Sequence, residues 1–202
     1  MSWIIVVYAY LHVSAYTFLS CYTITAFHKI CCERENHSVC PCVVAKQVLI
    51  IGAGPSGLAA IKEMKTAGFD VICLEKANDI GGVFRVSKDW SYDEMYLTIS
   101  NFYMAYSDFP PLEKQIRYSK KDDYFRYLQA YSLHFDLKRY IQFETTVVSA
   151  KLTTAMGKWH IKAQCKGKMM EYTPDTLIVA TGSNHSPHVI ETPGFTGQTL
   201  HS

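Results

Sequence analysis

The chain has 202 residues, of which 49% are hydrophobic, and a formal net charge of +2 at pH 7. A chain of this length and composition can bury a sizeable core, which argues against disorder over most of its length. The small net charge, without a basic stripe interleaved with aromatic residues, argues against nucleic acid as a partner.

The first 45 residues differ in character from the rest. Residues 3–27 contain no Lys, Arg, Asp or Glu. As a helix they would span about 37 Å, enough to cross a bilayer core of about 30 Å. The start lacks the basic region of a secretory signal, and Lys29 and Arg34 beyond the span favour a body on the cytoplasmic face. We therefore expect residues 1–45 to form a hydrophobic leader, a candidate anchor to a membrane such as the endoplasmic reticulum. The alternative is that this leader is not part of the natural domain.

The cysteines are concentrated in this leader. Cys73 and Cys165 stand alone in expected strands, which favours a reduced main body without disulfides. The other five are Cys21, Cys31, Cys32, Cys40 and Cys42. Their spacings, C-C and C-x-C, match no common zinc pattern, so we expect a Cys-rich linker, which lipidation could modify, and no metal site.

A glycine-rich motif opens the folded part of the chain. The apolar run "QVLII" (47–51) is typical of a buried parallel strand and leads directly into G-x-G-x-x-G. In this pattern Gly52 permits the tight turn, Gly54 lets the backbone approach a pyrophosphate, and Gly57 lets the next helix pack on the strand. The motif predicts a dinucleotide site at a helix N-terminus.

The residues after the glycines agree with this interpretation. Pro55 and Ser56 occupy the expected first turn of a helix, and Gly68 ends its apolar periodicity. A second buried strand, "DVICLEK", carries Glu75 at its end with Lys76 beside it. An acid at this place binds ribose hydroxyls and disfavours a 2′-phosphate, so FAD and NAD remain and NADP fits this site poorly.

The segment after the acid favours FAD. "NDIGGVFR" places a second glycine pair, Gly81 and Gly82, close behind Glu75. The combination of GAGPSGL, terminal acid and downstream GG-x-F resembles the FAD-binding half of flavoproteins with two dinucleotide sites. In that group the GG segment runs past the flavin, which implies that Gly82, Val83 and Phe84 lie beside it.

Further motifs follow in order. "AYSDFP" (105–110) precedes an expected helix, "DDYFRYLQAYSLHFDL", and the stretch "IQFETTVVSA". A β-meander is expected between Val147 and Tyr172, and then a buried strand over 177–180. We expect five residues at helical spacing to be core rather than cofactor contacts: Tyr124, Tyr127, Leu128, Tyr131 and Phe135. His160, His185 and His188 have no carboxylate at metal spacing and are expected at the surface.

This succession resembles the flavin-containing monooxygenases and their Baeyer–Villiger-like relatives over residues 46–202. The resemblance includes the ATG motif at residues 180–182 and the F-x-G-x-x-x-H fingerprint, carried by Phe195, Gly197 and His201. It implies an α/β, Rossmann-like FAD/NAD(P)-binding fold with a parallel sheet and an inserted antiparallel meander. It also implies that Thr181 and Gly182 approach the diphosphate and that the Val147 backbone meets the adenine.

The resemblance implies a reaction as well. NADPH reduces FAD, O2 adds to give a C4a-hydroperoxyflavin, and this oxygenates a small-molecule substrate at a nucleophilic nitrogen or sulfur. An Asn near the flavin contributes to catalysis in the family. Counting back from Asp108 without gaps puts Thr98 at that position, whereas a short deletion puts Asn101 there, and we prefer Asn101 because an amide can hold both flavin and nicotinamide groups.

The chain contains no second G-x-G-x-x-G for NADPH. We therefore expect residues 46–202 to be the FAD-binding portion of a truncated or fragmentary monooxygenase. Two alternatives remain: a non-catalytic FAD-binding chain, and another FAD/NAD(P)H oxidoreductase. The latter is disfavoured because no redox C-x-x-x-x-C follows the first helix.

Overall fold

The computed structural model describes residues 4–6, 46–85, 91–92, 94–153, 157–182 and 193–198. The helices are α2 (Pro55–Thr66), η1 (Gly82–Phe84), α3 (Asn101–Met104), α4 (Lys121–His134) and η2 (Lys138–Tyr140). The strands are β1 (Ile4–Val6), β2 (Gln47–Ile51), β3 (Asp70–Leu74), β4 (Tyr96–Ser100), β5 (Tyr118–Lys120), β6 (Ile141–Gln142), β7 (Thr145–Thr153), β8 (Lys158–Cys165), β9 (Lys168–Tyr172) and β10 (Thr176–Val179).

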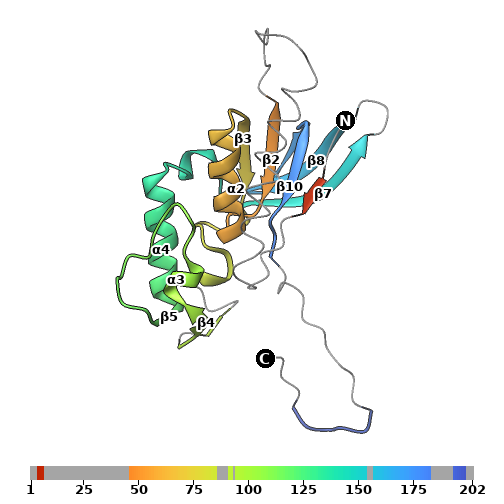
Figure 1. The fold of residues 1–202 in the computed structure, drawn as a ribbon. Helices are drawn as coiled ribbons and strands as arrows, with labels where there is room; N and C mark the ends of the chain where they lie inside the picture. The colour runs from red at the N-terminus through yellow and green to blue at the C-terminus, as the bar shows by residue number, and fades with distance from the viewer. Residues whose placement is uncertain are drawn as a thin grey trace.

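A parallel sheet forms the centre of the described fold. Its strand order is β1-β10-β2-β3-β6, and every neighbouring pair is parallel. β2, α2 and β3 form a β-α-β unit, with α2 lying in front of the sheet in Figure 1. Because both faces of such a sheet are covered, its strands are apolar at successive positions. The expected Rossmann-like fold with a parallel sheet is confirmed.

The two faces of the sheet bury different layers. On β2, Val48 and Ile50 join the cluster that contains α2 and α4, whereas Leu49 joins the cluster that contains the meander. This alternation follows from the two-residue side-chain period of a strand. The result is a helix–sheet–sheet sandwich, visible in Figure 1 with α2 and α4 on one side and β7 and β8 on the other.

The antiparallel sheet β7-β8-β9 is the expected β-meander. Trp159 and Ile161 of β8 pack against Leu49, Leu74 and Leu177 of the parallel sheet. The meander therefore covers one face of the parallel sheet.

A small two-stranded sheet, β4-β5, adjoins α3 and α4. Most residues that we expected in the core of α4 are buried, because they lie on one helical stripe. These are Tyr124, Tyr127, Leu128 and Tyr131, with Phe135 partly buried against the same cluster.

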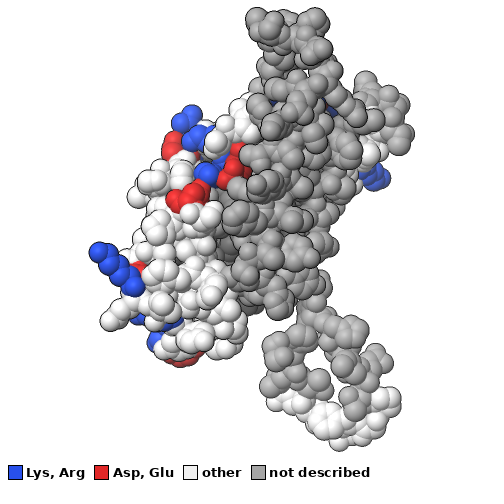
Figure 2. Space-filling view, viewed as in Figure 1, with Lys and Arg blue, Asp and Glu red and all other residues white. Residues whose placement is uncertain are grey.

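Charged side chains of both signs lie close together on the described part of the visible face, rather than forming a patch of one sign (Figure 2). Ion pairs among the described residues include Lys138 with Asp79 at 2.9 Å and Arg139 with Asp136 at 3.1 Å.

The leader differs from expectation where it is described. Ile4, Ile5 and Val6 are not helical but form β1, which pairs with Leu177, Ile178 and Val179 of β10. Ile and Val are β-branched and favour strands, so the three residues suit a strand at the edge of the sheet. No described helix combines the length and apolar character that crossing a bilayer requires. The rest of residues 3–27, the clustered cysteines, His185 and His188 lie outside the described residues.

Candidate cofactor-binding site

The carboxyl ends of three parallel strands meet at one edge of the sheet. Ile51, the last residue of β2, is in register with Leu74 of β3 and Val179 of β10. The next residues along each strand are Gly52, Glu75 and Ala180. The structure therefore brings together three segments that the sequence separates, at the edge where open α/β sheets bind nucleotides.

Two of the motif glycines are required by packing. Gly52 has φ +100°, and a Cβ on it would lie 2.5 Å from the carbonyl oxygen of Ala180. A Cβ on Gly57 would lie 1.9 Å from the carbonyl oxygen of Gly52. Both distances are shorter than any van der Waals contact, so these glycines let α2 pack directly on the strand ends.

The second glycine pair, Gly81 and Gly82, packs against the backbone of Ala53 and Gly54. A Cβ on Gly82, which has φ +58°, would lie 3.2 Å from the Cα of Gly54, and the Gly81 amide donates to the carbonyl of Ala53 at 2.9 Å. Gly54 itself has an ordinary φ of −73°, and a Cβ there would be 3.7 Å from the nearest heavy atom, the Cα of Gly82. The second pair thus supports the first, which the sequence motif alone did not reveal.

The N-terminus of α2 is suited to an anion. Gly54 caps this helix without a side-chain hydrogen bond, Pro55 follows it, and the first turn holds no acid. α4 differs, since it has a capping box and carries Asp122 and Asp123 in its first turn. A helix leaves its first amides without intrahelical acceptors, and its dipole favours negative charge there. The residues present therefore fit the diphosphate of a dinucleotide.

Glu75 is buried, with 6% of its surface exposed, and binds the loop that the glycines form. Its Oε2 accepts from the Ala53 amide at 2.6 Å, and its Oε1 accepts from the Ala77 amide at 2.8 Å. Each carboxylate oxygen can accept further hydrogen bonds. Glu75 can thus hold the glycine loop and still reach a ribose hydroxyl.

The other predicted contacts divide into two groups. Lys76, Thr181 and Gly182 are exposed and follow β3 and β10 at the same sheet edge as Gly52. Val147 lies farther along the chain in β7, where it pairs with Ala163 of β8. These positions are compatible with the predicted contacts, which stay predictions.

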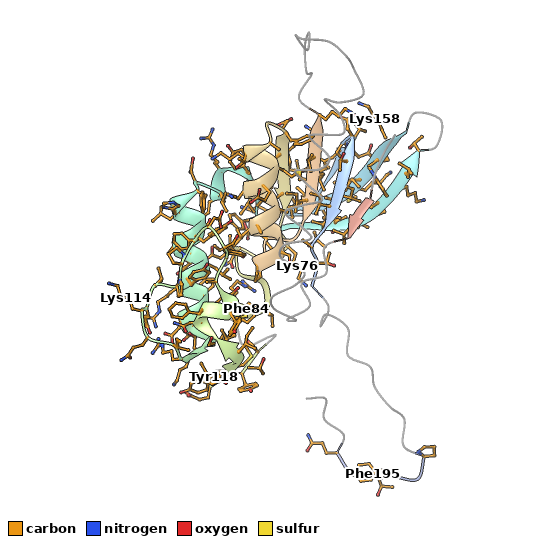
Figure 3. The ribbon with its side chains drawn as sticks, in the orientation of Figure 1. Lys76, Phe84, Lys114, Tyr118, Lys158 and Phe195 are labelled. Carbon is orange, nitrogen blue, oxygen red and sulfur yellow. The ribbon has the colours of Figure 1, made fainter. Side chains whose placement is uncertain are left out.

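The residues predicted beside the flavin are not equivalent. Val83 is 39% exposed, whereas Phe84 is 8% exposed and packs edge-on against Tyr124 at 4.7 Å between ring centroids. Figure 3 shows Phe84 near the α3 and α4 region and Lys76 nearer the parallel strands. Phe84 therefore anchors η1 in the core, and Val83 is the member of the pair that is free to face a cofactor.

Asn101 occupies a structural position. Its Nδ2 donates to the carbonyls of Glu113 and Gln115 at 3.3 and 2.9 Å, and its Oδ1 accepts from the Arg117 amide at 3.0 Å. It lines a cavity of about 170 Å³ beside the 111–117 loop. The amide is thus engaged in holding that loop, which weakens the preference for Asn101 as the catalytic amide. The alternative, Thr98, is exposed on β4.

The fingerprint residues are described in part. Phe195 and Gly197 lie in the exposed 193–198 segment, where Phe195 is 58% exposed, and His201 lies outside the described residues.

Sequence reasoning missed the role of Tyr106 in the "AYSDFP" segment. Its hydroxyl donates to the carbonyl of Pro55 at 2.7 Å, at the first residue of α2. Burial of this hydroxyl, with the neighbouring tyrosines, raises its pKa well above the ordinary value. Two residues on, Asp108 pairs with Lys62 of α2 at 2.5 Å. The order of motifs signalled this segment, but nothing in the sequence paired it with α2.

The chain matches the family "FMO-like: Flavin-binding monooxygenase-like" over residues 45–202. It is 40% identical over 161 residues to a 4-hydroxybenzoate brominase (decarboxylating) from Marinomonas mediterranea, covering 78% of this chain and 30% of that protein. It is 36% identical over 173 residues to human dimethylaniline monooxygenase [N-oxide-forming] 4, covering 79% of this chain and 31% of that protein. The chain thus spans about a third of the length of these curated relatives.

Solved structures show the same fold. The S-allyl-L-cysteine S-oxygenase from Allium sativum superposes with a TM-score of 0.68 at 26% identity, covering 75% of this chain and 39% of that one. An oxidised steroid monooxygenase bound to NADP superposes with a TM-score of 0.58 at 28% identity, covering 74% of this chain and 28% of that one. The resemblance inferred from the motifs is confirmed. This chain belongs to the flavin-binding monooxygenase-like family.

Proposed function

We propose that this chain binds FAD at the carboxyl edge of its parallel sheet and forms the FAD-binding part of an NADPH-dependent flavin monooxygenase. The proposal depends on one observation about the N-terminus of α2. Its N-cap, Gly54, makes no side-chain hydrogen bond, and its first turn contains no acidic residue. The buried carboxylate of Glu75 adjoins the same loop through the Ala53 amide. Amides for a diphosphate and an acceptor for a ribose are therefore adjacent, as a dinucleotide requires.

Bound FAD would supply the redox and oxygen chemistry, and the residues of this chain would bind and orient it. The first amides of α2 would neutralise the diphosphate, and Glu75 would fix the ribose. Gly82, which lies next to Gly54, and Val83 after it would direct the flavin end along the second glycine segment. The chain's own contribution is thus positioning.

The substrate would be bound by a longer protein, since the relatives are about three times the length of this chain. We propose a nucleophilic nitrogen or sulfur atom as the site of oxygenation, since relatives include an N-oxide-forming enzyme and an S-oxygenase. A second candidate, halogenation of a phenolic acid, is favoured by the 40% identity to the brominase. Both candidates use the FAD site proposed above.

A first experiment separates FAD binding from folding. We expect the purified chain to bind FAD, measured by flavin fluorescence quenching and isothermal titration calorimetry. Gly54→Ala should lower the affinity, because its methyl group would stand where the diphosphate approaches the backbone. The ordinary φ and the 3.7 Å clearance limit the loss of stability to that of a weaker N-cap, about 1 kcal/mol or less. Equal FAD affinity in both proteins would contradict the proposed site.

A second variant tests the charge that the site prefers. Ser56→Asp places a carboxylate in the first turn of α2. Its negative charge should stabilise the ligand-free helix by interacting with the helix dipole, and it should repel a bound diphosphate. Thr173→Asp, at an exposed position after β9, adds the same charge elsewhere. We expect only the first substitution to weaken FAD binding. NADPH oxidation by the FAD-loaded chain, with candidate amines, thioethers and 4-hydroxybenzoate, then distinguishes a non-catalytic FAD-binding chain from an active enzyme.

A further inference from the structure

The "AYSDFP" segment, residues 105–110, is attached to the phosphate-binding helix at two points. The Tyr106 hydroxyl donates to the carbonyl of Pro55 at 2.7 Å, and the Asp108 carboxylate pairs with Lys62 at 2.5 Å. Pro55 and Lys62 are seven residues apart in α2, so they lie about two turns apart on the same face. The segment therefore follows α2 along its first two turns.

The same segment is also fixed from the other side. The Tyr127 hydroxyl of α4 accepts from the Tyr106 amide at 2.7 Å and donates to the carbonyl of Phe109 at 2.6 Å. The Tyr106 ring lies 4.2 Å from that of Tyr131 and 5.9 Å from that of Tyr127. With both its backbone and its ring held by α4, the Tyr106 hydroxyl has little freedom to point elsewhere.

The carbonyl of Pro55, which accepts the hydrogen bond from Tyr106, affects the amide next to it. The carbonyl of Pro55 and the amide of Ser56 belong to one peptide group. A hydrogen bond received by a carbonyl polarises its peptide group and strengthens the amide as a donor, which is the cooperative effect seen in hydrogen-bond chains. Ser56 is the second residue of α2, and its amide has no intrahelical acceptor.

We propose that Tyr106 is a positioning residue for the FAD diphosphate, acting through the Pro55–Ser56 peptide group. Its hydroxyl fixes the plane of this peptide and polarises the Ser56 amide toward the phosphate oxygens. The inference rests on the proposed function, because it needs an anion at the N-terminus of α2. It assigns Tyr106 a role that the glycine motif does not contain, since the motif specifies only the backbone of the loop.

The identity of the acceptor favours this role over a purely structural one. The acceptor is the one carbonyl whose peptide group carries the first available amide of α2. A phenylalanine here would fill the same space without providing the bond.

The test compares Tyr106→Phe with Tyr124→Phe. Tyr124 is a matched control, because it is buried in the same aromatic cluster and its hydroxyl donates to the Met104 carbonyl at 3.3 Å rather than to α2. In apo protein, we expect Tyr106→Phe to move the Ser56 amide proton resonance upfield, and Tyr124→Phe to leave it unchanged. This measurement requires no FAD.

Ligand binding supplies the second readout. We expect Tyr106→Phe to weaken binding of FAD and of ADP about 1.5- to 4-fold, because the Tyr106–Pro55 bond exists with and without ligand and only its cooperative effect on the Ser56 amide contributes to affinity. Adenosine binding should be unchanged, because adenosine lacks the diphosphate. Tyr124→Phe should leave the affinity for all three ligands unchanged.

Each outcome has a defined meaning. An unmoved Ser56 resonance, or equal losses for ADP and adenosine, would overturn the role of Tyr106 while the FAD site stands. A wild-type chain that binds neither FAD nor ADP would overturn the proposed function and this inference with it. Melting temperatures of both variants, measured beside the wild type, identify losses that come from unfolding.

Discussion

Glu75 and Ala53 are joined by a 2.6 Å hydrogen bond between the Oε2 atom and the backbone amide. The residue that follows β3 thereby holds the glycine loop that follows β2. A second bond, from the Ala77 amide to Oε1 at 2.8 Å, fixes the orientation of the carboxylate. The acid that the sequence assigned to a ribose is therefore also part of the loop's own structure.

Glu75→Gln should destabilise the fold even without FAD. An amide side chain cannot accept both bonds, so one buried N–H would face another N–H, at a cost of about 1–3 kcal/mol. Urea denaturation of the apo protein measures this change. Glu171→Gln, which removes an exposed carboxylate paired with Lys162 at 3.1 Å, should change the unfolding free energy little. Equal stability of the two variants would show that Glu75 serves the ligand alone.

Gly57→Ala should destabilise the protein strongly, by about 3 kcal/mol or more, because overpacking at a backbone contact leaves nothing flexible to move. The added Cβ would lie 1.9 Å from the carbonyl oxygen of Gly52. Gly167→Ala provides the comparison: it meets no atom within 4 Å and carries only the strain of φ +81°, about 1–2 kcal/mol. Thermal unfolding followed by circular dichroism ranks the two, and a smaller loss for Gly57→Ala would contradict the described packing.

Two leucines on α4 provide a test of the helical layer. Leu128 is fully buried and Leu133 is 84% exposed. We expect Leu128→Ala to lower the unfolding free energy by about 2–5 kcal/mol, through lost burial and the resulting cavity. Leu133→Ala should change it by no more than about 0.5 kcal/mol. Both values come from the same denaturant titration, and similar losses would mean that α4 does not pack as described.

The buried tyrosines predict a loss of stability in alkali. Burial raises the pKa of Tyr106 and Tyr124 above the ordinary value of 10.0. Below pH 10 both states keep these protons, so the contribution to stability is constant. Above it, the unfolded chain releases protons that the folded chain retains, and the unfolding free energy falls by up to about 1.4 kcal/mol per pH unit for each tyrosine.

Comparison with variants isolates this effect from other groups that titrate in alkali. The unfolding free energy of Tyr124→Phe should fall less steeply above pH 10 than that of the wild type. Tyr172→Phe, at a partly exposed position where burial raises the hydroxyl pKa less than at Tyr124, should reduce the slope less than Tyr124→Phe does. Parallel curves for all three proteins would exclude the buried hydroxyl as the cause.

Sequence patterns are sufficient to predict the β-α-β unit, the meander and the dinucleotide motif. Each of these depends on local patterns: apolar runs, glycines at fixed spacing, and an acid at a strand end. Gly52, Gly57 and Glu75 were identified in this way because their roles follow from backbone conformation and order along the chain. The identity of residues 121–134 as a core helix follows likewise from helical periodicity.

The distant residues that contact this motif could be identified only from the packing of the folded chain. Gly82 against Gly54, and Tyr106 on the carbonyl of Pro55, are contacts between segments separated by 28 and 51 residues. Likewise, the strand formed by Ile4–Val6 could not be expected from an apolar run, which suits a membrane helix and a sheet edge equally. Local patterns set the conformation of each segment, but the packing of segments against one another sets the partners of each hydrogen bond.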